Sequence, residues 1–274
     1  MIAFPPCKIN LGLNVIRKRD DGYHDIETVF CPVPWTDALE VVRSETFQFT
    51  LSGLPIVDPP TNNLCVNAYK LLKDNYGIGA VSIHLHKVIP MGAGLGGGSS
   101  DAAHTLKLLD AVFHLNLGMD ALLRYASLLG SDCPFFIHGK PAIGRGRGEQ
   151  LSAVDLRLAG KFLIIVVPDI HVSTAKAYEG VTPSVPERPC SRVVAEVPFT
   201  QWKHYLGNDF EKSVAGAYPI IDQVKSILYG TGAVYAAMSG SGSAVYGIFE
   251  KPVVLPSTLS HYPHWSGFLS LDRN

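Results

Sequence analysis

Five glycines lie within the fourteen residues PMGAGLGGGSSDAA, which run from Pro90 to Ala103. Glycine loses more conformational entropy on folding than other residues, so a glycine run suits positive φ angles or close approach of a ligand to the backbone. Ser99, Ser100 and Asp101 follow and are good N-caps for a helix. Free N–H groups and the positive end of a helix dipole would then bind a phosphate group. The alternative is an ordinary glycine-rich turn, which needs only one or two glycines.

Two familiar phosphate motifs overlap this stretch but fit it poorly. Gly92, Gly94 and Gly97 match G-x-G-x-x-G, yet a dinucleotide site also needs an acidic residue about 20 positions later. That region, from His114 to Gly118, contains none. The frame of a Walker loop requires a lysine where Gly98 stands. A cation for the phosphates must therefore come from elsewhere in the chain.

The flanking segments predict a strand before the loop and a helix after it. Residues 81–88 alternate between apolar and polar side chains, and residues 100–115 carry apolar side chains at helical spacing. His84 and His86 share one strand face; without a third ligand, we expect them to face solvent rather than a metal. Similar patterns predict strands at 8–16, 26–33, 38–51 and 162–167, helices at 62–75, 119–129 and 219–229, a glycine-rich turn at 144–149, and two strands flanking SGSGS at 239–243.

Four segments of the chain together resemble the GHMP kinase superfamily. They are CKINLGLNVIRKRDDGYHDIETVF (7–30), the glycine-rich loop, LGSDCPFF (129–136) and MSGSGSAVYGIF (238–249). The resemblance implies an α+β fold of two lobes with the active site in the cleft between them. We expect a nucleotide-binding lobe at 1–155 and a smaller C-terminal lobe at 156–274 that contributes to the substrate site. The implied activity is ATP-dependent phosphorylation of a small-molecule alcohol.

The resemblance also assigns residues to ATP. Asn63 and Leu64 would meet the adenine, although Asn63 is equally an N-cap for the helix at 62–75. Lys87 would lie on the nucleotide side, although a lysine at a strand end is usually solvated. The phosphates would be bound by the loop residues Pro90, Met91, Gly92, Ala93, Gly94, Leu95, Gly96, Gly97, Gly98, Ser99 and Ser100.

Phosphoryl transfer to an alcohol requires aligned oxygens and stabilised negative charge, and a base that receives the hydroxyl proton helps. By resemblance Asp132 is that base, and Lys8 lies beside it and keeps it ionised. From its position alone, Asp132 is also an N-cap for a short helix with Pro134 in its first turn. Lys8 and Asn10 share a strand face, so the alternative for both is a solvated surface. Asn10 would hydrogen-bond the substrate.

One branch of the superfamily shares Lys-Ile-Asn followed by Asp-Gly-Tyr-His, as found between Lys8 and His24. Its substrate is a cytidine-diphosphate-linked polyol of the non-mevalonate route to isoprenoids. Tyr23 would stack on one face of the cytosine with His24 at its polar edge, and Tyr178 aligns with the aromatic partner on the other face. Asp132, Thr174, Ser239 and Gly240 complete the implied substrate site. Alternatives are a homoserine or mevalonate kinase, or a non-catalytic ligand-binding regulator of this fold.

Composition argues against nucleic-acid binding and a membrane span, and it favours the cytoplasm. The net charge of −1 suggests no basic face for nucleic acid, and the apolar run FLIIVV is too short to span a membrane. The five cysteines are odd in number and lack C-x-x-C spacing, which indicates reduced thiols. Cys7 and Cys133 flank site residues, which predicts sensitivity to oxidation. Mg²⁺ is expected with ATP; Ser99 or Ser100 could supply one oxygen, but the sequence identifies no ligand set and no oligomeric state.

Overall fold

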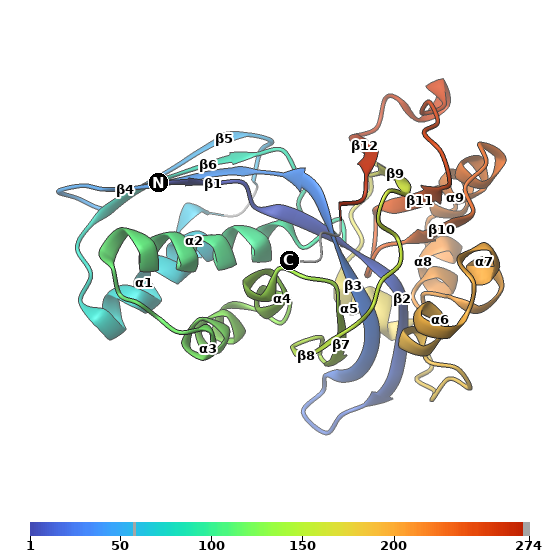
Figure 1. The fold of residues 1–274 in the computed structure, drawn as a ribbon, viewed down its shortest axis with the longest axis horizontal. Helices are drawn as coiled ribbons and strands as arrows, with labels where there is room; N and C mark the ends of the chain where they lie inside the picture. Colours follow the sequence, from blue (N-terminus) through green and yellow to red (C-terminus); the bar gives the residue numbers. More distant parts are fainter. Residues whose placement is uncertain (57–58, 271–274) are drawn as a thin grey trace. The chain divides into compact units, whose positions relative to one another are not determined.

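The computed structural model describes residues 1–56 and 59–270, which form two compact units (Figure 1). Unit 1 contains Met1–Cys7, Pro34–Met91 and Gly96–Lys140. Unit 2 contains Lys8–Val33, Gly92–Leu95 and Pro141 onward. The units interleave along the chain, whereas a single boundary was expected between residues 155 and 156. That position lies inside unit 2, and the assignment of lobes to the two halves of the chain stays a prediction.

Unit 1 is a four-stranded sheet with helices on one side (Figure 1). The strand order is β1 (Ile2–Ala3), β4 (Ala38–Arg43), β6 (Val81–Lys87) and β5 (Gln48–Gly53), with β5 parallel to β6. Apolar side chains of β6 at alternate positions are buried, as a half-buried strand requires. The helical elements are η1 (Pro60–Asn62), α1 (Leu64–Tyr76), α2 (Gly97–Phe113), α3 (Met119–Leu129) and α4 (Cys133–His138).

Unit 2 contains two further sheets. One has the order β2 (Pro6–Lys18), β3 (His24–Thr36), β7 (Ala142–Gly146) and β8 (Gln150–Ala153). The other has the order β10 (Tyr235–Met238), β11 (Val245–Phe249), β9 (Phe162–Val166) and β12 (His264–Phe268), and its strand pairs are all antiparallel. The helical elements are α5 (Thr174–Glu179), α6 (Cys190–Glu196), η2 (Phe199–Gln201), α7 (Trp202–Tyr205), α8 (Glu211–Ala217), α9 (Ile220–Gly230) and η3 (Ser257–Leu259).

Three strands of the sheet β10-β11-β9-β12 are buried along their whole length. Every residue of β9, β10 and β11 is buried, since helices α8 and α9 and other segments of unit 2 cover the sheet. The predicted strand over 162–167 is thereby confirmed to within one residue. Among the described residues, none of the helices combines the length and apolar character needed to cross a membrane.

Three sequence-based expectations differ from the structure or are refined by it. The strand predicted at 38–51 is two strands, because the chain turns after Arg43, where the Ser44 hydroxyl donates to the Thr46 carbonyl at 2.8 Å. Ser99, Ser100 and Asp101 are not N-caps, since Gly96 takes this position with φ of +71° and α2 begins at Gly97. His84 and His86 are exposed, as expected, and their rings contact the Ser52 hydroxyl at 2.8 and 2.9 Å.

Candidate functional site

The first half of the glycine-rich loop is packed against the turn between β10 and β11. Gly94 has φ of +76°, and a Cβ there would lie 2.0 Å from the carbonyl oxygen of Ser239. The N–H of Ala244 donates to the carbonyl of Ala93 at 3.0 Å. Only glycine fits at position 94, because both the backbone angle and the approach of the Ser239 carbonyl exclude a side chain. Gly94 is therefore needed for the packing of the loop against Ser239.

Lys8 and Asn10 form a buried polar cluster beneath this part of the loop. Each is 3% exposed, because β2 is covered on both faces. The Lys8 ammonium donates to Asn10 Oδ1 at 2.6 Å and to the Gly94 carbonyl at 2.9 Å. Asn10 Nδ2 donates to Thr28 Oγ1 at 2.9 Å, and the Ser239 hydroxyl donates to the Gly94 carbonyl at 2.8 Å. The alternative of a solvated strand face is therefore wrong for both residues.

The second half of the loop opens helix α2. Gly97 is buried, and a Cβ there would lie 3.1 Å from Ile89 Cγ2 and 3.2 Å from Lys87 Nζ. Gly98 is half-exposed, and a Cβ there would meet only the flexible end of Met91, at 3.3 Å. The first N–H groups of a helix have no partner within the helix. This end of the loop can therefore present N–H groups and the helix dipole to an anion.

Lys87 lies at the end of β6 and is buried, so its interpretation as a solvated strand-end lysine is wrong. Its ammonium donates to Asp37 and, at 2.8 Å, to Asp101 Oδ2. Burial lowers the pKa of Lys87, but the two carboxylates outweigh it and the pKa lies above the usual lysine value. Burial raises the pKa of Asp101 to about 7. The sequence analysis identified neither Asp37 nor Asp101 as a partner of Lys87.

Asp132 occupies the N-cap position of α4, with Pro134 in the first turn. Its side chain makes no capping hydrogen bond to α4. The N-cap interpretation is therefore confirmed for the position of Asp132 but not for a capping bond. The next residue, Cys133, hydrogen-bonds with the side chain of Ser99 in the first turn of α2, and the charge of Asp132 acts on the same thiol. Asp132 therefore lies on a segment that contacts the helix after the glycine-rich loop, within unit 1. Its pairing with Lys8, a residue of unit 2, stays a prediction.

Cys7 and Cys133 are both fully buried. Burial raises the pKa of the Cys133 thiol to about 12, so very little thiolate forms at neutral pH. Because the thiolate is the species that reacts with oxidants, the structure does not support the expected sensitivity to oxidation.

Asn63 caps helix α1, as its N-cap interpretation predicted. Asn63 Oδ1 accepts a hydrogen bond from the N–H of Cys65 at 2.9 Å, and Leu64 is the first residue of the helix. Capping uses the side-chain oxygen of Asn63. Contact of Asn63 and Leu64 with adenine stays a prediction.

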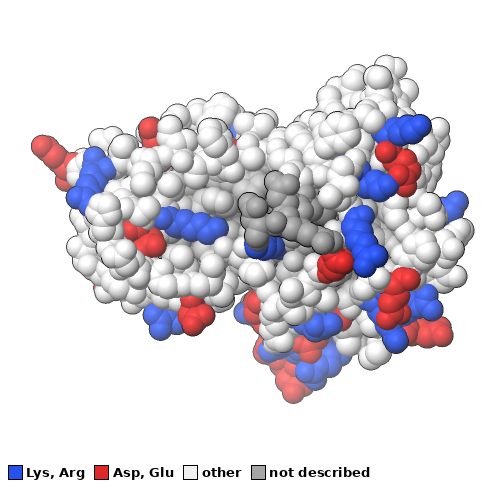
Figure 2. Space-filling model, in the orientation of Figure 1, with Lys and Arg blue, Asp and Glu red and all other residues white. Residues whose placement is uncertain are grey.

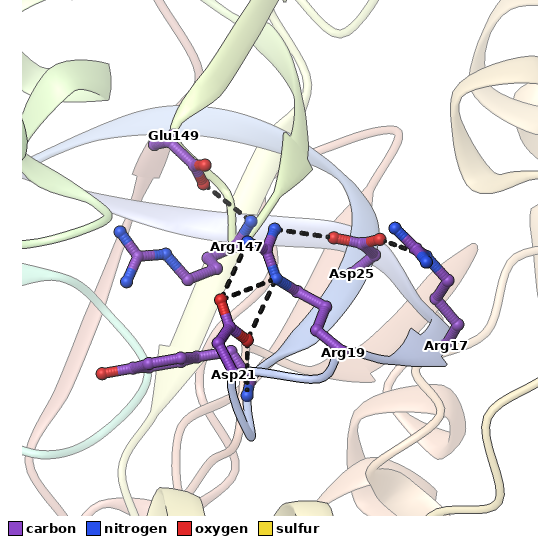
Figure 3. A network of polar contacts seen from close by, with 7 residues as sticks. Arg17, Arg19, Asp21, Asp25, Arg147 and Glu149 are labelled. Carbon is purple, nitrogen blue, oxygen red and sulfur yellow. Dashed lines mark hydrogen bonds and ion pairs between the residues drawn. The ribbon is translucent and has the colours of Figure 1, made fainter.

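Tyr23 lies at the turn between β2 and β3. Figure 3 shows the network of charged side chains around this turn. The Tyr23 ring is 55% exposed, and the guanidinium carbon of Arg147 lies 4.8 Å from the ring centroid. Asp21 Oδ1 accepts from the N–H of Tyr23 at 3.1 Å, while Arg19 pairs with Asp21 and Asp25. Figure 2 shows positive and negative side chains intermixed at this lower edge, where Figure 1 draws the turn. Tyr23 is thus an exposed aromatic ring on a braced turn.

His24 and Tyr178 lie side by side in unit 2. Their rings stack with centroids 4.5 Å apart, and Phe210 meets Tyr178 edge-on at 4.8 Å. Burial and, secondarily, the charge of Lys18 lower the pKa of His24, which favours a neutral imidazole. Thr174 begins α5, and its hydroxyl lies 3.2 Å from that of Ser241. The structure thus places Tyr178 against His24.

Asn208 is a site residue that sequence reasoning missed. Its side-chain nitrogen donates to the carbonyls of Met238 and Gly240 at 2.9 and 2.8 Å, and its oxygen accepts from the N–H of Phe210 at 3.0 Å. Asn208 therefore fixes the turn that contains Ser239 and Gly240. The available signal was the polar pair Asn208-Asp209 shortly before α8.

Comparison with known proteins identifies both parts of the chain. The model of the GHMP kinases N terminal domain matches residues 63–140, and the GHMP kinases C terminal model matches residues 199–255. A 4-diphosphocytidyl-2-C-methyl-D-erythritol kinase of Parabacteroides distasonis is 49% identical over 98% of this chain and 100% of its own length. The kinase of the same name from Bacteroides fragilis is 49% identical over 91% of this chain and 92% of its own.

Solved structures share the fold over almost the whole chain. The crystal structure of a 4-(cytidine 5'-diphospho)-2C-methyl-D-erythritol kinase matches with a TM-score of 0.83 and 32% identity, covering 98% of this chain and 99% of the other. A homoserine kinase from Cytophaga hutchinsonii matches with a TM-score of 0.64 at 15% identity, covering 97% of this chain and 95% of the other. A mevalonate kinase from Methanococcus jannaschii also reaches 0.64, at 16% identity, over 91% of this chain and 90% of its own. The last two likenesses show the α+β fold alone.

Proposed function

The chain belongs to the 4-diphosphocytidyl-2-C-methyl-D-erythritol kinase family of the GHMP kinases, and we propose that it phosphorylates this cytidyl substrate with ATP. The product is the 2-phosphate, an intermediate of the non-mevalonate route to isoprenoids. The observation that best supports the proposal is the bond from the Lys8 ammonium to the Gly94 carbonyl. It joins the lysine that the resemblance assigns to catalysis to the loop that would hold phosphate.

ATP would bind along the glycine-rich loop, with its phosphates at Gly96, Gly97 and Gly98. Support comes from the start of α2 at Gly97 and from the open space at Gly98. Asn63 and Leu64, at the start of α1, would contact adenine.

Asp132 would accept the proton of the acceptor hydroxyl. The hydroxyl oxygen then bonds to the γ-phosphorus of ATP, the bond from that phosphorus to the β–γ bridging oxygen breaks, and ADP leaves. Lys8 would draw the acceptor oxygen toward phosphorus, since its ammonium already lies at the loop. Its buried setting would strengthen that attraction, because few water molecules screen it. Asn10 would then hydrogen-bond the substrate beside Lys8.

Mg²⁺ is the metal ion that this chemistry implies. The part of the chain that the structure describes holds no group of three side chains suited to a metal. The donor set nevertheless fits Mg²⁺, which prefers hard oxygens and takes most ligands from phosphates and water. The hydroxyl of Ser99 or Ser100, in the first turn of α2, would supply one protein oxygen to it. When bound, the ion would neutralise charge on the ATP phosphates.

The cytidine end would bind at the turn between β2 and β3. Tyr23 offers an exposed ring for stacking, and a neutral His24 offers one donor and one acceptor to the cytosine edge. Tyr178 would support His24, and Thr174, Ser239 and Gly240 would complete the substrate site. We place the enzyme in the cytoplasm, which is supported by the five cysteines, since none of them forms a disulfide.

The test is release of ADP on mixing the protein with ATP and the cytidyl alcohol, with mass spectrometry of the product. We expect a gain of one phosphoryl group. A homoserine or mevalonate kinase would instead turn over its own alcohol, and a non-catalytic regulator would release no ADP with any of them.

A further inference from the structure

The strands and helix that flank the phosphate loop meet at one buried ion cluster in unit 1. It consists of Asp37, Lys87 and Asp101, whose side chains are 0%, 0% and 2% exposed. Asp37 lies between β3 and β4, Lys87 ends β6, and Asp101 belongs to the second turn of α2. The ammonium of Lys87 donates to both carboxylates. Three separate elements are therefore joined through one side chain.

The cluster holds both ends of the loop. On the near side, Asp37 Oδ1 accepts from the N–H groups of Val88 and Ile89, at 2.6 and 2.9 Å. On the far side, Asp101 Oδ2 accepts from Lys87 and fixes the beginning of α2. Between these anchors a Cβ on Gly97 would lie 3.2 Å from Lys87 Nζ, so the ammonium lies directly below the helix start. The chain is thereby tied at 88–89 and again at 101.

A gain in the free energy of unfolding does not by itself account for the cluster of Asp37, Lys87 and Asp101. Removing charges from water is costly, and apolar residues of similar volume often stabilise a protein as well as or better than a buried ion pair. Here two carboxylates share one ammonium, and Asp101 Oδ1 and Ser100 Oγ are buried without a hydrogen-bond partner among the described residues. An unsatisfied buried polar atom adds a further cost. A cluster that costs stability but fixes backbone geometry suits a site that needs exact positioning of N–H groups.

We propose that Asp37 and Asp101 are positioning residues that act through Lys87 to clamp both ends of the phosphate loop in its ATP-binding form. The proposal rests on the proposed function, since it assumes that the loop binds ATP. Asp37 and Lys87 act at the end of β6, before the loop, and Asp101 acts in α2, after it. The effect of this clamp should therefore reach the ATP phosphates and leave the cytidyl substrate unaffected.

The experiment compares the full chain with its Asp37→Asn and Asp101→Asn variants. Each change keeps the shape of the side chain and replaces a carboxyl group that contacts the Lys87 ammonium with a neutral amide. We expect the Kd of ATP, measured by calorimetry, and the KM for ATP to rise about ten- to a hundredfold, as for a displaced binding group. The KM for the cytidyl substrate should stay within about twofold. Asp110→Asn is the matched control, because Asp110 lies on the same helix but accepts from the N–H of Leu117, away from the loop.

Thermal unfolding of each variant separates positioning from stability. If Asp37→Asn and Asp101→Asn lower only the Tm and bind ATP as the wild type does, the clamp is structural and the proposal is wrong. An equal rise in KM for both substrates would also overturn it. If Asp101→Asn does not fold, Asp101→Ser removes the same charge with a smaller side chain and must give the same selective loss. A wild type that binds no ATP would refute the proposed function itself, which is a separate outcome.

Discussion

The imidazole ring of His24 lies parallel to the phenol ring of Tyr178, with 4.5 Å between the ring centroids and 13° between the planes. Phe210 meets Tyr178 edge-on, with 4.8 Å between the ring centroids. A base that stacked on the face that His24 covers would have to displace the imidazole. We therefore infer that Tyr178 orients His24, while the exposed ring of Tyr23 is the surface on which a cytosine would stack.

Tyr23→Ala should raise the KM for the cytidyl substrate about ten- to a hundredfold, since stacking of a base on an aromatic ring contributes about 1–3 kcal/mol. The KM for ATP should not change. Stability should hardly change either, because the ring is 55% exposed. Steady-state kinetics with each substrate varied in turn provide the measurement.

Tyr205→Ala is a matched control for that variant. Tyr205 is 53% exposed and has the guanidinium of Arg188 5.3 Å from its ring centroid, much as Arg147 lies over Tyr23. If both alanine variants raise the KM for the cytidyl substrate equally, the effect does not come from stacking at Tyr23.

Gly98→Val should weaken ATP binding at least about tenfold and leave a cooperative fold, because the new side chain would occupy the space proposed for a phosphate. In the protein it would press only on the flexible end of Met91. Gly97 is a less informative position, since a side chain there would also meet Ile89 and the Lys87 ammonium. Calorimetric titration measures the Kd of ATP, and an unchanged value would reject the loop as the phosphate site.

Asp132→Asn should lower kcat by about 10²- to 10⁴-fold with the Kd of ATP nearly unchanged, because an amide cannot accept the hydroxyl proton. The unfolding free energy is measured alongside, since an amide keeps the size of the Asp132 side chain and its N-cap position on α4. Rapid-quench measurement of the chemical step and urea unfolding test the two parts. A destabilised variant with normal turnover per folded molecule would identify Asp132 as a structural residue.

Acid should destabilise the protein through His104. Burial lowers the pKa of His104 to about 4, while a ring nitrogen lies 2.8 Å from the Ser100 carbonyl oxygen. In the unfolded chain the His104 imidazole is protonated as the pH falls through about 6.5. In the folded chain it is protonated only near pH 4. The contribution of His104 to stability is therefore full above pH 6.5 and is lost as the pH falls toward 4. By this linkage the loss is at most about 3 kcal/mol.

His104→Gln isolates this contribution. Urea unfolding at several pH values should show that the difference in stability between wild type and variant shrinks or reverses between pH 7 and pH 4.5. The difference is the informative quantity, since the raised pKa of Asp101 acts in the opposite direction across part of the same range. His261→Gln, at an exposed histidine, is the control. Parallel pH curves for wild type and His104→Gln would contradict the prediction.

Local patterns predicted the elements that position the site. The alternation over 81–88 and the glycine run followed by an apolar helix gave β6 and α2 to within a few residues. The start of α2 was misplaced because a left-handed glycine at 96, rather than a serine side chain, ends the loop. The short helices α5 to α8 were missed, since segments of four to seven residues carry too little periodicity.

The surroundings of the site residues were harder to predict. Lys8, Asn10 and Lys87 each suit an exposed strand position by type, yet all three are buried. What covers them comes from distant parts of the sequence, such as Ser239 over Asn10 and Asp37 beside Lys87. The spacing of residues close together in one sequence does not predict contacts between residues that lie far apart in it. The family resemblance identified the residues, but not the neighbours that hold them.

The most direct test of the account is the release of ADP by the purified protein with ATP and each of four alcohols in parallel. We predict efficient turnover of 4-diphosphocytidyl-2-C-methyl-D-erythritol, with kcat/KM at least about a hundredfold above that for methylerythritol phosphate, homoserine or mevalonate, since loss of the stacked and hydrogen-bonded cytosine costs several kcal/mol. Equal phosphorylation of homoserine or mevalonate, or no ADP release with the cytidyl alcohol, would contradict the proposed function.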